Sequence, residues 1–96
     1  MNRVAFKTYL CDYLRPNGAH LTAPAIAKRI RKAEEAEGVL RHSLDVSVAS
    51  DVQMRTDLIL LRTNNTHEIR YGQMQNALRK YYHMTHGRFF PRLRDV

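Results

Sequence analysis

The residues with the clearest chemical potential are basic and amide side chains in the last third of the chain. Between residues 69 and 96, six arginines and lysines face one acid, so this segment carries a net charge of +5 out of the total of +7. Arginine can bind the guanine edge in the DNA major groove, and asparagine or glutamine the adenine edge, while any cation can contact phosphate. The candidates are Arg70, Gln73, Asn76, Arg79 and Lys80 on one predicted helix face, and Arg88 just after it.

A second basic cluster lies in the first half of the chain, at Lys28, Arg29, Arg31 and Lys32. Helical spacing places Lys28, Arg31 and Lys32 on one face, where mobile cations can approach phosphates. The alternative is a solvated face that the acids at positions 34, 35 and 37 offset. Because these acids follow the cations instead of mixing with them, the cluster remains a candidate DNA-binding face.

The overall charge indicates the class of partner. A net charge of +7 and a pI near 10.1 favour an anionic partner, namely DNA, RNA or an acidic protein. Double-stranded DNA is our first prediction. RNA is less favoured because few aromatic residues stand beside the cations as stacking platforms. The other hypothesis is a protein-protein interaction module that docks an acidic surface through aromatic anchors: Tyr71, Tyr82, Phe89 and Phe90.

Other chemistry finds little support in the sequence. His83 and His86 share a helix face, but no carboxylate or second cysteine is near them, so we expect two solvated imidazoles and no metal site. No catalytic motif or glycine-rich phosphate loop occurs, so we expect no enzymatic activity and no cofactor. No apolar run approaches a membrane span. The single Cys11, expected to be a buried or half-buried filler, fits a reducing cytoplasm.

Four helices must position these residues. Apolar periodicity predicts them at about residues 3–14, 23–37, 51–62 and 67–85. Thr22 is predicted to cap the second helix, Ser50 and Gln53 to form a capping box on the third, and Asn65 or Thr66 to cap the fourth. Residues 40–49 alternate apolar and polar positions, which allows a short strand, but an isolated strand would have no partner and we expect an extended loop.

These elements predict an all-α fold, a small four-helix bundle. We expect residues 1–87 to form a single helical domain and residues 88–96 a basic C-terminal tail. Phe89 and Phe90 in that tail are candidates to anchor it onto the core.

Three segments carry a resemblance to a known family. "FKTYLCDYL", "LTAPAIAKRIRKAEEAEGVL" and "YGQMQNALRKYYHMTHG", with a helix between the last two, resemble the N-terminal core-binding (SAM-like) domain of tyrosine recombinases, also called phage integrases. The likeness covers residues 5–87 and consists of helical patterns. It implies a four-helix module that clamps one side of duplex DNA, with its second and fourth helices toward the major groove. These helices carry the two basic clusters already described.

A recombinase also needs a catalytic domain with its own Arg, His and Tyr residues, and we do not expect these residues' chemistry in this chain. The spacing of Tyr81 and Tyr82 suits packing, so neither is predicted to be a nucleophile. We therefore expect a small bacterial or phage-type accessory or regulatory protein that binds DNA without cutting it.

Overall fold

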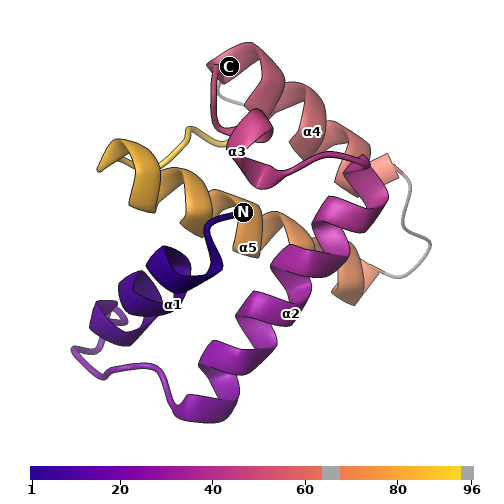
Figure 1. The fold of residues 1–96 in the computed structure, drawn as a ribbon. Helices are drawn as coiled ribbons and strands as arrows, with labels where there is room; N and C mark the ends of the chain where they lie inside the picture. Colours follow the sequence, from indigo (N-terminus) through magenta and orange to yellow (C-terminus); the bar gives the residue numbers. More distant parts are fainter. Residues whose placement is uncertain (64–67, 94–96) are drawn as a thin grey trace.

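The computed structural model describes residues 1–63 and 68–93, and the side chains of residues 1–62 and 72–93. Within these residues the chain is a compact all-α globule (Figure 1), which confirms the all-α part of the predicted fold class. The described part contains no β-strand, and one isolated antiparallel bridge joins Leu14 to His20. Its helices are α1 (Arg3–Asp12), α2 (Ala23–Leu40), α3 (Leu44–Ser47), α4 (Asp51–Thr63) and α5 (Glu68–His86).

The helix starts follow the predicted capping residues. The Thr22 hydroxyl accepts a hydrogen bond from the Ala25 amide at 3.3 Å, and the Ser50 hydroxyl accepts one from the Gln53 amide at 3.1 Å. The predicted capping box is only half formed, because the Gln53 side chain donates to Asp57 at 2.9 Å instead of returning to Ser50. The prediction that Asn65 or Thr66 caps the last helix falls outside the described residues.

Residues 40–49 differ from the predicted extended loop. Helix α2 continues through Gly38 to Leu40, and α3 follows, with the Ser43 hydroxyl accepting from the Asp45 amide at 3.2 Å. Leu44 and Val48 are buried, whereas Val46 between them is exposed. The alternation suggested an extended chain, but residues four apart also share a helix face, and burial of Leu44 and Val48 favours that helical turn.

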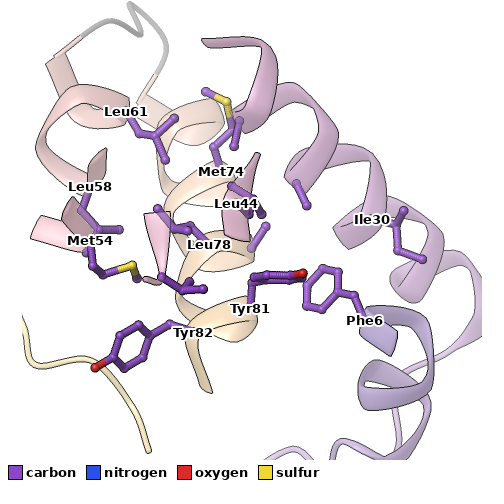
Figure 2. Close-up of a cluster of buried hydrophobic side chains, with 14 of the residues drawn as sticks. Phe6, Ile30, Leu44, Met54, Leu58, Leu61, Met74, Leu78, Tyr81 and Tyr82 are labelled. Atoms are coloured by element: carbon purple, nitrogen blue, oxygen red, sulfur yellow. The ribbon is translucent and has the colours of Figure 1, made fainter. Parts of the chain in front are cut away.

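The core lies where α5 crosses α2. Figure 1 shows α1 beside the first half of α2, and α5 packs most extensively against α2. Ala33 and Ala36 of α2 and Ala77 of α5 are buried in this core. Figure 2 shows larger buried side chains of this core, with the ring of Tyr81 next to that of Phe6. None of the described helices is long and apolar enough to cross a bilayer.

The chain after α5 folds back along that helix. Gly87 takes a positive φ of 73° at the helix end, a conformation that glycine adopts without strain. Phe90 is buried and meets Tyr82 edge to face, with ring centroids 5.1 Å apart. Phe90 therefore anchors this segment to the core, while Phe89 remains 60% exposed.

The amino group of Met1 joins α1 to the loop before α3. It lies 2.7 Å from Glu37 Oε2, 2.6 Å from the Ser43 hydroxyl and 3.4 Å from Asp45 Oδ2. Partial burial acts to lower the pKa of this amino group, but the hydrogen bond and charge of Glu37, with those of Asp45, outweigh it and raise the pKa above 8.0. The hydrogen bond from Tyr81 lowers the pKa of Asp45 despite its partial burial, with help from Ser43 and the Met1 ammonium.

This network predicts how stability depends on pH. Because folding raises the pKa of the Met1 amino group, its stabilising contribution is fully present below pH 8 and is lost as the pH rises through the folded-state pKa. Folding lowers the pKa of Asp45, so its stabilising contribution is present above pH 3.8. It is lost as the pH falls through the folded-state pKa of Asp45. We expect the melting temperature to fall between about pH 7 and pH 9.5, below the range in which tyrosines titrate. A chain acetylated at Met1 should not show that fall, and an equal fall in both chains would contradict the role of the ammonium.

Candidate nucleic-acid interface

The basic cluster on α2 has two exposed members and two partly buried members. Lys28 and Arg31 are exposed, and neither forms an ion pair with any residue in the described part of the chain. Lys32 is bound to Glu35 at 3.0 Å, and its side chain is only 12% exposed. Arg29 is half-buried, with its Nε atom buried and unpartnered, because it flanks the apolar stripe of the helix. Lys28 and Arg31 are therefore the residues of this cluster that can contact an anionic partner.

Helix α1 adds a cation that the sequence analysis did not select. Lys7, Arg3 and Arg31 line a groove of about 570 Å³ between α1 and α2, whose lining also includes Ile26 and Ile30. Arg3 is paired with Glu34 at 3.3 Å, whereas Lys7 is exposed and forms no ion pair among the described residues. The position of Lys7 directly after the buried Phe6, and four residues after Arg3, could have indicated this basic face.

Cys11 also lines this groove and is exposed, so the prediction of a buried or half-buried filler is wrong. The physical reason is its place on the helix. Leu10 occupies the buried stripe of α1, and the next residue turns about 100° away from it.

The cations predicted on α5 are largely engaged inside the protein. Arg79 donates from Nη1 to the carbonyl of Phe90 at 2.9 Å and to that of Pro91 at 3.2 Å. Burial, and to a lesser extent Arg92, lowers the pKa of Arg79. The Lys80 ammonium lies 4.3 Å from the centroid of the Tyr13 ring. Arg79 thus holds the C-terminal segment, and Lys80 packs on an aromatic face.

The remaining predicted residues around α5 have mixed positions. Asn76 is exposed and Gln73 is half-buried, so both retain access to solvent. Arg88 is exposed but lies 3.5 Å from Asp51 and 5.2 Å from the Tyr82 ring centroid. The side chain of Arg70 lies outside the described residues. Of the predicted residues on and after α5 whose side chains the structure describes, Asn76 and Arg88 are therefore the most exposed.

The two histidines of α5 are not simply solvated, contrary to our expectation. His83 Nδ1 shares a hydrogen bond with the Tyr9 hydroxyl at 2.6 Å, and its ring stacks on Phe89. His86 Nε2 lies 2.6 Å from the Val48 carbonyl. Across the residues that the structure describes, no three histidine, cysteine or acidic side chains converge as metal ligands.

A buried polar cluster escaped the sequence analysis. His42 Nε2 lies 2.7 Å from Asp57 Oδ2 and 3.2 Å from the Ser47 hydroxyl, and Asp57 is only 1% exposed. This is not a catalytic triad, since the same imidazole nitrogen faces both partners and leaves the serine without a separate base. The cluster instead joins the loop before α3 to α4. The sequence signal for this cluster was the position of Asp57, three residues after Met54 and four before Leu61, on the apolar face of the helix.

Two of the four aromatic anchors of the alternative hypothesis lie in the core. Tyr82 and Phe90 are buried in the core and cannot reach a partner, because their rings pack against the helices. Phe89 is exposed, and the Tyr71 side chain lies outside the described residues. Comparison of the chain with protein-family models, with curated proteins and with solved structures gives no match. Any function assigned to the candidate site must therefore be argued from the geometry of its residues.

Proposed function

We propose that this protein is a non-enzymatic DNA-binding module that contacts the phosphates of duplex DNA through the outer face of α2. The observation that carries this proposal is the exposure of Lys28 and Arg31 with no acidic partner among the described residues. Lys7 extends the same basic surface across the groove from α1. Free cations on adjoining helices favour binding to a polyanion, because each phosphate contact releases condensed counterions.

The fold supports a more specific form of this proposal. The four longer helices, with a second helix that carries free cations, fit the core-binding (SAM-like) type of the integrases. In that type the second and fourth helices lie toward the DNA, and in this chain these positions would correspond to α2 and α5. Here α5 would contribute Asn76 and Gln73, while Arg79 supports the structure. We infer a cytoplasmic accessory or regulatory role, in which the module binds DNA without cutting it.

The test is binding of a fluorescent duplex at several salt concentrations. Replacing both Lys28 and Arg31 with alanine should weaken binding about tenfold and reduce the salt slope by about 2, because two phosphate contacts are lost. The matched control is the double replacement of Arg55 and Arg62, two exposed arginines on α4, which removes the same charge from another helix.

Two outcomes would contradict the proposal. An equal loss in the α2 and α4 variants would mean that net charge, and not the α2 face, determines binding. Absence of binding to DNA at low salt, together with binding to polyglutamate, would instead support the protein-interaction hypothesis, in which the same cations dock an acidic protein surface.

A further inference from the structure

A second surface feature lies where the end of α1 meets the end of α5. It is a pocket of about 630 Å³, called here the aromatic pocket. Most of its lining is aromatic, which distinguishes it from the aliphatic groove between α1 and α2. The lining residues are Tyr9, Asp12, Tyr13, Leu14, Pro16, His83 and Phe89.

The rings of this pocket are held in place by one another. The ring of Phe89 stacks on that of His83, with centroids 3.9 Å apart and planes within 4°. His83 is fixed in turn by its 2.6 Å hydrogen bond with the Tyr9 hydroxyl. Phe89 nevertheless remains 60% exposed. A large aromatic ring that is oriented by its neighbours and open to solvent is a preorganised surface for a planar ligand, since little side-chain entropy is lost on binding.

The charges beside the pocket match a nucleotide. The Lys80 ammonium lies over Tyr13, 4.3 Å from its centroid. Arg15 stands between Leu14 and Pro16, is exposed, and has no acidic partner among the described residues. Burial, with a smaller effect of Tyr13, raises the pKa of Tyr9 to about 12, so its hydroxyl stays uncharged near neutral pH. The acid in the lining, Asp12, can accept from the exocyclic amino group of a base.

We propose that the aromatic pocket binds the base of an unpaired nucleotide, with Lys80 and Arg15 near its phosphates. Base–aromatic stacking contributes about 1–3 kcal/mol per base and tolerates any sequence. Few aromatic residues stand beside cations in the sequence, because Tyr13 and Lys80 are far apart along the chain and meet only in the fold. This inference rests on the proposed DNA-binding function and adds a preference for DNA that has a single-stranded segment.

The experiment compares two fluorescent DNA ligands. Both contain the same duplex with the same single-stranded overhang, but in one of them the overhang is abasic, so that the two carry equal charge. The overhang with bases should bind at least about fivefold more tightly, because one stacked base suffices for this factor. Phe89→Ala should abolish that advantage, and Phe89→Trp should retain it. Val52→Ala, which trims an exposed apolar side chain on α4 away from the pocket, should leave it unchanged.

The outcomes separate this inference from the proposed function. Equal affinity for both overhangs, with duplex binding that still depends on Lys28 and Arg31, would overturn the aromatic pocket alone. If the unmodified protein bound neither DNA ligand, both the proposed DNA-binding function and the aromatic-pocket inference would be overturned. Binding of a proline-rich peptide that competes with neither overhang but requires Phe89 would assign the pocket to a protein ligand, because aromatic grooves also bind polyproline helices. Melting temperatures serve to check that the Phe89 variants are folded. Because this ring is largely exposed, we expect its replacement to change the melting temperature little.

Discussion

Replacing His42 with alanine is expected to lower the free energy of unfolding by about 3 kcal/mol, because it leaves a buried carboxylate without its main partner. Asp57 is almost completely buried, and one of its oxygens lies 2.7 Å from His42 Nε2. The other oxygen accepts from the Gln53 side chain at 2.9 Å, and among the described residues only that bond would remain. The variant therefore loses a favourable contact and also pays the desolvation cost of the carboxylate.

A double-mutant cycle distinguishes these two contributions. In an Asp57→Asn background, in which no buried charge can be left behind, His42→Ala should cost only about 1 kcal/mol. The coupling between the two positions should then be about 2 kcal/mol, measured by urea denaturation. His20→Ala, at an exposed histidine, serves as the control and should change stability by less than about 0.5 kcal/mol. An identical cost of His42→Ala in both backgrounds would show that the charge of Asp57 is not involved.

The elements with strong local signals could be predicted from the sequence. Apolar residues at helical spacing located the four longer helices to within three residues at each end, because each such stripe must be buried somewhere. Thr22 and Ser50 were identified as caps because a hydroxyl before a helix satisfies amides of its own first turn. Such interactions involve residues only three apart, so no knowledge of the fold is needed.

The parts that could not be predicted depend on contacts between distant segments. Arg79 looked like a free cation on a polar face, yet the carbonyls that bind it belong to a segment that folds back after α5. The pairing of His42 with Asp57 depends in the same way on how α4 packs beneath the loop before α3. Charge and spacing therefore selected the candidate DNA-binding residues, but only the fold separated Lys28 and Arg31 from cations that have internal partners.

Truncation of Phe6 is expected to destabilise the fold strongly. Its ring is completely buried and meets Tyr81 edge to face, with centroids 5.3 Å apart at 71° (Figure 2). Phe6→Ala should lower the free energy of unfolding by about 4 kcal/mol, from the lost apolar contact and the cavity that remains. That loss is a large part of the roughly 5–15 kcal/mol that stabilises a small domain.

The same substitution tests whether α1 belongs to the proposed binding surface. A helix of ten residues is not stable alone in water, so α1 depends on Phe6 and Leu10 for its attachment. It supplies Lys7 to the groove and Tyr9 to the aromatic pocket. Below the unfolding transition, Phe6→Ala should therefore increase amide hydrogen exchange first in α1 and weaken DNA binding. Val4→Ala, at a side chain 78% exposed on the same helix, should do neither. Uniform exchange throughout the Phe6→Ala variant would instead mean that α1 unfolds only with the whole domain, and any weaker binding would then reflect global unfolding.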